Sequence, residues 1–394
     1  MELYWNRKNL ADVWTWPHIF WLNIFGWWGE EAKTEFGRKW LTRFRSLSIV
    51  YFACLITSMM IQVYIKFAEG DIMQNLFTIF ASGPGMVGIF KFFDLVIHRK
   101  ILKSIMGRLS GLISEVNDPI LNTMTRKAFK KTWIIFLSTL LVFDSVVLHW
   151  ALRPIIAAIL HKEKTRIIES WPVFLDTWTQ FFLSYLFQVP GVILLGHSFY
   201  IYDNLYFCTS DVILCHFEIL KHKLNRLVLN ENEKSSKDLV SCVKYHSAIL
   251  SVCNDFRDAT SKVIIWQSIN TVIMLCTGIF ILTYLGKNIN SNALMNLGEV
   301  SFTLCTCLYY YCWFSNEITL QCTKVSNAVY MTNWISAKSS DKKIMLITMT
   351  RAMHPVMFGG IMQINLSTFI NVLKTTFSFY NFLIAVQVSS TKNE

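Results

Sequence analysis

The stretch that decides the fold covers residues 326–388 and reads SNAVYMTNWISAKSSDKKIMLITMTRAMHPVMFGGIMQINLSTFINVLKTTFSFYNFLIAVQV. Ser326, Tyr330 and Trp334 recur every four residues, which predicts a helix with all three side chains on one face. A serine-rich break follows, so we expect a second helix to begin after it. We interpret the two as a pair of helices in the cytoplasm.

Single residues predict where the second helix begins and where the membrane span that follows it begins. Ser340 or Asp341 is expected to cap this helix, which runs through Arg351, because a short oxygen side chain accepts hydrogen bonds from the free N–H groups of a first turn. From Met357 onward the apolar run carries only Lys374. At about 1.5 Å per residue it is long enough to cross a bilayer core of about 30 Å. This region therefore predicts cytoplasmic helices followed by one last span.

The composition predicts a membrane protein throughout. Of 394 residues, 53% are hydrophobic and 15% aromatic, and the mean hydropathy is +0.38, as expected for a polytopic chain. The first apolar stretch follows a long charged leader, so no cleaved signal peptide is expected. The predicted fold class is an all-α membrane protein with seven transmembrane helices, at residues 46–67, 72–97, 133–152, 177–201, 263–286, 297–318 and 356–387.

The basic residues predict how the spans are oriented. The N-terminal segment and alternate loops hold 28 Lys and Arg residues, against six on the opposite side. Because basic loops stay on the cytoplasmic side, we expect a cytoplasmic N-terminus and, with an odd number of spans, an extracellular C-terminus. This orientation is inverted relative to a G-protein-coupled receptor. The net charge of +11 lies mostly on the face that meets anionic lipid headgroups, so membrane lipids and not nucleic acid are the expected partners.

Motifs for catalysis and metal binding are missing from the sequence. We find no Walker loop, zinc motif or Ser/His/Asp grouping that the spans would bring together, so no enzyme, cofactor or metal is expected. None of the ten cysteines falls in a predicted outer loop, which argues against a structural disulfide. Broken helices and intramembrane charge leave a transporter possible, but no internal repeat is visible.

The C-terminal region resembles that of the insect odorant receptors. The residues that carry the resemblance are Ser326, Tyr330, Trp334, Arg351-Ala352, Pro355, Gly360, Thr368-Phe369, Val372-Leu373-Lys374 and Phe377-Ser378-Phe379-Tyr380. The resemblance implies a seven-helix subunit, four of which form a cation channel that odorants open and whose last helices line the pore. The divergent gustatory receptors are an alternative, although their terminal Thr-Tyr and Gln-Phe pattern is matched only loosely by Tyr380 and Gln387.

The same resemblance implies partners, a location and four regions. The odorant co-receptor has a sizeable insertion in the loop that here covers residues 202–262; because this loop is short, we expect the ligand-binding subunit, partnered by the co-receptor in a heterotetramer. The expected location is the plasma membrane of olfactory neuron dendrites. The expected regions are a cytoplasmic interfacial segment at 1–45, a six-span bundle holding the odorant pocket in its outer half at 46–318, cytoplasmic anchor helices at 319–355, and the pore-lining last span with a short extracellular tail at 356–394.

Aromatic and small polar residues recur at helical spacing in the outer halves of the spans, which predicts a pocket for a small, volatile, apolar molecule. Packing or lipid contact is the alternative role for each of them. The predicted pocket residues are Phe77, Phe80, Val147, Trp150, Trp178, Phe182, Tyr185, Phe280, Thr283, Phe302, Cys305 and Tyr309.

Three further groups of residues complete the predictions. Ile384 and Val388 stack on one face of the last helix beside Gln387, which predicts an apolar gate at its outer end. Tyr330, Trp334 and Met349 are predicted to form the subunit contacts of the anchor. Among the charges at membrane depth, Lys91 and Asp94 are three residues apart and are expected to pair with each other, whereas Asp144 and Lys374 are expected to face protein or water.

Overall fold

The computed structural model describes the chain with short gaps. The described residues are 22, 35–69, 72–114, 118–160, 162–167, 176–230, 232–285, 291–359 and 363–391. Every regular element in these ranges is helical, which confirms the all-α fold. The helices are α3 (Glu35–Glu69), α4 (Ile72–Ser114), α5 (Pro119–Leu160), α6 (Trp178–Asn225), α7 (Glu233–Leu285), α8 (Ser291–Tyr330), the short 3₁₀ helix η2 (Trp334–Ser336), α9 (Ser339–Ala352) and α10 (Leu366–Thr391).

Seven long helices correspond in order to the seven predicted spans. Within the described ranges, the segments long and apolar enough to cross a membrane are Glu35–Ala68, Pro119–Leu160, Trp178–Asn225 and Glu233–Tyr284. Several helices extend well beyond their predicted spans, because the residues between spans four and five continue α6 to Asn225 and begin α7 at Glu233. Apart from Leu22, residues 1–34 of the predicted cytoplasmic interfacial segment lie outside the described residues, and α3 begins at Glu35.

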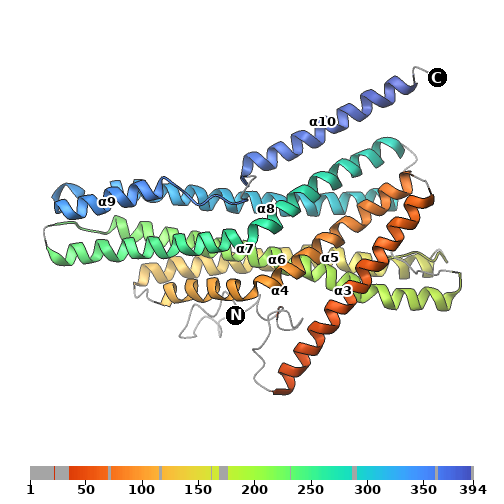
Figure 1. Ribbon diagram of the computed structural model, residues 1–394, viewed down its shortest axis with the longest axis horizontal. Helices are drawn as coiled ribbons and strands as arrows, with labels where there is room; N and C mark the ends of the chain where they lie inside the picture. Colours follow the sequence, from red (N-terminus) through yellow and green to blue (C-terminus); the bar gives the residue numbers. More distant parts are fainter. Residues whose placement is uncertain are drawn as a thin grey trace.

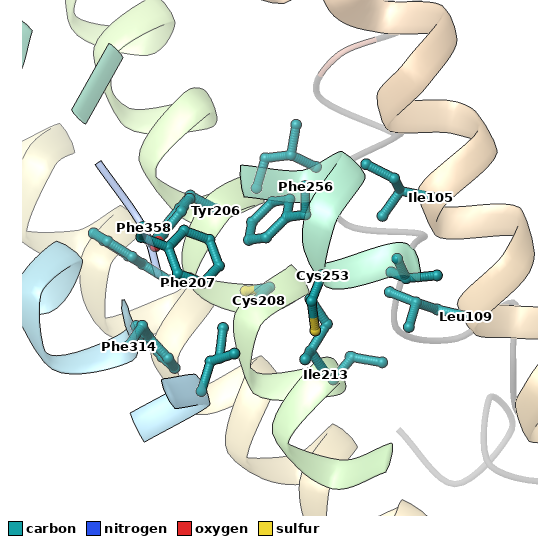
Figure 2. Packing of buried hydrophobic residues seen from close by; sticks show 14 of the residues in the cluster. Ile105, Leu109, Tyr206, Phe207, Cys208, Ile213, Cys253, Phe256, Phe314 and Phe358 are labelled. Atoms are coloured by element: carbon teal, nitrogen blue, oxygen red, sulfur yellow. The ribbon is translucent and has the colours of Figure 1, made fainter. Parts of the chain in front are cut away.

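The long helices form one elongated bundle (Figure 1). Helices α4 to α8 run side by side along the long axis, and α3 crosses them obliquely. Helix α9 folds back along α8 at one end of the bundle, and α10 leaves the bundle from its contacts with α7 and α8. The buried core is rich in aromatic side chains, as Figure 2 shows for Tyr206, Phe207, Phe256, Phe314 and Phe358. This core ties α6 to α7, α8 and the segment before α10.

The C-terminal helix pair differs from its prediction in two places. Helix α8 ends at Tyr330, so Trp334 lies in η2 and not on the same helix. The two rings still approach within 6.4 Å between centroids. Neither Ser340 nor Asp341 caps α9, because both lie inside the helix and Lys338 holds the N-cap position with no side-chain bond. The Asp341 carboxylate instead accepts a hydrogen bond of 2.7 Å from Ser236 of α7. The Asp341 carboxylate therefore makes a tertiary contact with α7 and does not cap the first turn of α9.

The last span also starts later than predicted, because α10 begins at Leu366 and not at Val356. Asn365 caps its first turn, with its side-chain oxygen accepting a bond of 2.9 Å from the backbone N–H of Thr368. Before it, Gly359 has a φ of 95°, a left-handed conformation that suits a residue without Cβ. The chain can therefore turn sharply between α9 and α10 before the final helix begins.

Candidate functional site

An apolar cavity of about 140 Å³ lies in the bundle where five helices meet. Met59 comes from α3, Pro84 and Gly85 from α4, and the remaining lining residues from α5, α6 and α8. The full lining is Met59, Pro84, Gly85, Phe143, Val146, Val147, Trp150, Val192, Leu195, Gly196, Phe199, Val300, Thr303 and Leu304. No charged side chain belongs to it, so the space suits a neutral, mainly apolar molecule.

Proline and glycine shape the walls of this cavity. Pro84 lies inside α4, where it removes one backbone hydrogen bond of the helix. At Gly196 of α6, a Cβ atom would lie 2.3 Å from a methyl carbon of Val147 on α5. Only a residue without a side chain lets the two helices approach this closely. The wall between α5 and α6 is therefore set by one glycine and the valine that faces it.

The polar groups at the cavity come from α5 and α8. The Trp150 indole N–H donates a hydrogen bond of 3.1 Å to the Glu299 carboxylate, which also contacts His149 Nδ1 at 3.0 Å. These contacts fix the Trp150 ring and join α5 to α8. One turn further along α8, the Thr303 hydroxyl is buried and has no hydrogen-bond partner. A ligand in the cavity can satisfy this hydroxyl, since a buried polar group without a partner is costly.

A buried ion pair lies next to the cavity. Lys91 Nζ is 2.6 Å from Asp203 Oδ1, with the two side chains 0% and 1% exposed, and it sits 3.4 Å from the centroid of the lining residue Phe199. The predicted pair of Lys91 with Asp94 is therefore wrong. Asp94 instead accepts a bond of 2.9 Å from the Tyr202 hydroxyl and pairs with His98. Spacing along α4 could not reveal these contacts, because Asp203 and Tyr202 both belong to α6.

The other intramembrane charges are more exposed. Asp144 of α5 lies 3.7 Å from His197 Nε2 of α6, with about half of its side chain accessible. Lys374 is exposed on α10. Within the described residues, no group of three or more His, Cys, Asp and Glu side chains is arranged to hold a metal ion.

The structure brings Val147 and Trp150, of the predicted pocket residues, into the cavity lining. The others lie elsewhere. Phe80 is buried in a neighbouring cluster with Met274 and Ile281, and Tyr185 donates its hydroxyl to the Ala151 carbonyl. Three of the residues are exposed: Trp178 at 44%, Phe182 at 54% and Phe302 at 64%. Phe280 stacks on Tyr284, and the Thr283 hydroxyl donates to the Ile279 carbonyl. Cys305 packs against the main core. The Phe77 side chain lies outside the described residues.

Tyr309 has a different place from the one predicted. Its ring lies 5.6 Å from that of Phe369, so it joins α8 to the start of α10. The sequence signal for the cavity was its small residues: the Gly83-Pro84-Gly85 break in α4 and the glycines of α6. Aromatic periodicity directed the prediction toward the outer ends of the helices, while the cavity lies where helix kinks and glycines leave space.

The predicted anchor and gate residues lie at opposite ends of the structure. Tyr330 and Trp334 are 55% and 39% exposed, whereas Met349 is half-buried against the core. Ile384 is 36% exposed on α10. Gln387 and Val388 belong to the same helix, and their side chains lie outside the described residues.

Comparison with known proteins agrees with this architecture. Odorant receptor 42b of Drosophila melanogaster is 26% identical over 211 residues, which cover 52% of this chain and 51% of the relative. Odorant receptor Or2 of Anopheles gambiae is 22% identical over 193 residues, covering 46% and 50% of the two chains. The aligned segments thus span about half the length of these curated relatives.

Solved structures extend the likeness over nearly the whole chain. The insect olfactory receptor OR5 from Machilis hrabei, in complex with eugenol, superposes with a TM-score of 0.81 over 95% of this chain and 98% of that chain, at 15% identity. The fold is therefore that of an insect olfactory receptor, a multi-pass membrane protein. The family model described as 7tm Odorant receptor matches residues 68–377. This match covers most of the chain, which belongs to the 7tm odorant receptor family, a family of receptors and not of enzymes.

Proposed function

We propose that this chain is the odorant-binding subunit of a ligand-gated cation channel in the plasma membrane of olfactory neuron dendrites. The observation that carries the proposal is the apolar cavity between α3, α4, α5, α6 and α8, found in a chain of the odorant receptor family. A receptor for volatile molecules needs such a space, because apolar ligands gain their affinity from removal from water.

The cavity indicates the class of ligand. Its volume of about 140 Å³ is close to that of an apolar protein cavity of about 150 Å³ that takes up benzene. A ligand of this size has roughly the bulk of a benzene ring, and its apolar part faces Val147, Leu195 and Phe199. The unpartnered Thr303 hydroxyl can exchange one hydrogen bond with it. We therefore propose a small volatile molecule with one carbonyl, ether or hydroxyl group and no charge.

Helix α10 is the pore-lining element in this proposal. Its apolar side chains Ile370, Phe377 and Phe382 are 49%, 62% and 61% exposed, so much of the helix is left for other surfaces to cover. Ile384, Gln387 and Val388 near its end form the proposed gate, where branched apolar side chains exclude ions by dewetting. On this proposal Val388→Ser eases wetting and raises the ligand-free current. An unchanged ligand-free current would place the gate elsewhere.

Assembly with the odorant co-receptor in a heterotetramer is the last part of the proposal. The anchor end exposes apolar side chains outside the predicted spans, with Tyr330 at 55%, Met331 at 75% and Ile335 at 73%. Burial of such surface in water stabilises an assembly by about 25 cal/mol per Å². These residues are therefore the proposed subunit contact, with the anchor on the cytoplasmic side.

The test is ligand-evoked current in cells that express this chain with and without the co-receptor. Monosubstituted benzenes and six-carbon esters serve as the ligand panel, and whole-cell recording with a nucleotide-free internal solution removes G-protein signalling. We expect cation current only with both chains present and with at least one member of the panel. Current that depends on internal nucleotide would contradict a ligand-gated channel. An N-terminal epitope tag stained in unpermeabilised cells would contradict the proposed orientation.

A further inference from the structure

The Asp203 carboxylate, buried next to the cavity, uses its two oxygens unequally. Oδ1 accepts two bonds, one of 2.6 Å from Lys91 Nζ and one of 2.5 Å from the Tyr311 hydroxyl. Oδ2 is buried and receives no bond from a nitrogen or a hydroxyl. The Cys307 thiol interacts with the same carboxylate as a donor, and a thiol is only a weak donor. The Tyr311 hydroxyl therefore has two possible acceptors, the doubly bonded Oδ1 and the weakly satisfied Oδ2.

Lys91 connects this carboxylate to the cavity. Its side chain is fully buried, so its interactions are with the protein groups around it. Those partners are Asp203 and the face of Phe199, whose ring centroid is 3.4 Å from Nζ. Phe199 itself lines the cavity. A ligand that moves the Phe199 ring therefore alters the environment of the Lys91 ammonium, which responds through its bond to Asp203.

Tyr311 connects the same carboxylate to the base of α10. Its ring lies 4.7 Å from that of Tyr206, and Tyr206 stacks on Phe256 at 5.0 Å. Both rings contact Phe358, at 6.4 Å and 6.1 Å. Figure 2 shows Tyr206 and Phe256 near Phe358, which lies in the segment between α9 and α10. A shift of Tyr311 is thus transmitted through packed rings to the segment that precedes α10.

We propose that Lys91, Asp203 and Tyr311 form a two-position switch, in which the Tyr311 hydroxyl moves between the two Asp203 oxygens and couples ligand occupancy to the base of α10. This inference rests on the proposed function. The Tyr311 hydroxyl is bonded in both positions, so the two positions differ little in energy. A ligand selects one position because its contact with Phe199 is more favourable in that position than in the other. The three residues are positioning residues and do not touch the ligand, except through the ring of Phe199.

A static clamp is the competing explanation, in which the cluster only holds α4, α6 and α8 together. The two explanations differ in what loss of the Tyr311 hydroxyl changes. In a clamp, Tyr311→Phe lowers the amount of folded receptor but leaves each remaining receptor normal. In a switch, each remaining receptor opens poorly and binds the ligand no more tightly than the wild type, because without the hydroxyl neither position gains a bond and ligand occupancy no longer biases the segment before α10.

The experiment compares Tyr311→Phe with Tyr202→Phe in cells that express the co-receptor. Tyr202 is a matched control because it also donates a buried hydroxyl to a carboxylate, that of Asp94 at 2.9 Å, and neither residue lines the cavity. The probe is the benzene derivative or ester that gives the largest current with the wild-type chain. Two quantities are measured: its Kd for the purified chain by calorimetry, and the maximal current per receptor at the cell surface.

For Tyr311→Phe we expect a maximal current per receptor reduced by at least about fivefold at saturating ligand, and a Kd that is unchanged or weaker because the coupling is reciprocal, with both quantities near wild type for Tyr202→Phe. An equal loss of current in both variants, or a normal current per receptor in Tyr311→Phe, would overturn the switch. Failure of the wild-type pair to respond at all would instead refute the proposed function.

Discussion

Lys91 and Asp203 form an ion pair that no water reaches: Nζ and Oδ1 are 2.6 Å apart, and the side chains are 0% and 1% exposed. The pair joins α4 to α6 next to the apolar cavity, where Lys91 lies against the lining residue Phe199. Removal of one partner would leave the other charge buried and uncompensated.

Lys91→Met is therefore expected to destabilise the protein by about 3–5 kcal/mol. The double variant Lys91→Met with Asp203→Asn should recover much of this loss, because no buried charge remains. The measurement is the fraction of monodisperse protein left after heating, followed by size-exclusion chromatography. Lys100→Met, at an exposed position of the same helix, is the control and should change little. Equal losses in the single and double variants would argue against charge as the cause.

Gly196→Ala should block the cavity by steric conflict. The added Cβ would lie 2.3 Å from a Val147 methyl carbon, so α5 and α6 must separate or Val147 must enter the cavity. We expect the agonist concentration for half-maximal current to rise by about tenfold or more, and Val147→Ala in the same chain to restore it. Gly107→Ala on α4, where a Cβ meets nothing within 4 Å, should leave sensitivity unchanged. A lack of rescue by Val147→Ala would disprove the conflict.

Thr303→Val tests the one unpartnered hydroxyl at the cavity. The change keeps the shape of the side chain and removes its hydrogen bond, which is worth about 0.5–1.5 kcal/mol. Sensitivity to agonists that carry a carbonyl or hydroxyl should fall by roughly two- to tenfold, while hydrocarbons of equal size should act as on the wild type. Thr306→Val, outside the lining, is the control. An equal loss for both ligand classes would mean that the hydroxyl has no direct contact with ligand.

Trp150→Ala and Tyr309→Ala should affect different quantities: the first the ranking of ligands, the second the maximal current. Trp150 lines the cavity, so its truncation should reorder the ligand series. Tyr309 packs on Phe369 of α10, so its truncation should alter the maximal current and preserve the ranking. Dose–response curves for the full panel on both variants provide the measurement. A reordered series in Tyr309→Ala would return that residue to the pocket in which the sequence placed it.

Trp334→Ala should weaken assembly with the co-receptor. Trp334 is 39% exposed and lies against Tyr330 at the anchor end, and aromatic side chains often dominate the energy of an interface. We expect less tetramer on native gels, with Val228→Ala, at an exposed apolar residue between α6 and α7, as a control that assembles normally. Unchanged tetramer in Trp334→Ala would mean that the ring packs only within its own subunit.

The sequence predicted helix number and order because long apolar runs are a local property. It also indicated that a short helix and a last long helix follow α8, since breaks and charges are local too. The Lys91 to Asp203 pair was missed because its partners are far apart in the chain, and spacing along α4 favoured Asp94 instead. The start of α10 was missed because Asn365 and Gly359, two small features inside an uncharged run, set where the helix begins.

The cavity was only partly predictable for a related reason. Val147 and Trp150 were found through their helical spacing, whereas most of the lining is supplied by ordinary aliphatic residues and glycines. Such residues gain their role from which helices cross and how closely. That information is absent from any single helix, so periodicity in an aromatic stripe could not distinguish a pocket wall from a packed surface.

The uninterrupted course of α8 has a mechanical consequence. The helix holds Glu299 beside the cavity rim, Tyr309 against α10 and Tyr330 at the anchor end, all on one rod of 40 residues, about 60 Å long. A tilt of about 2° pivoted at one end of a rod this long displaces the other end by about 2 Å. On the proposed function, a ligand no larger than a benzene ring would therefore be able to displace the anchor end of α8, which it does not contact.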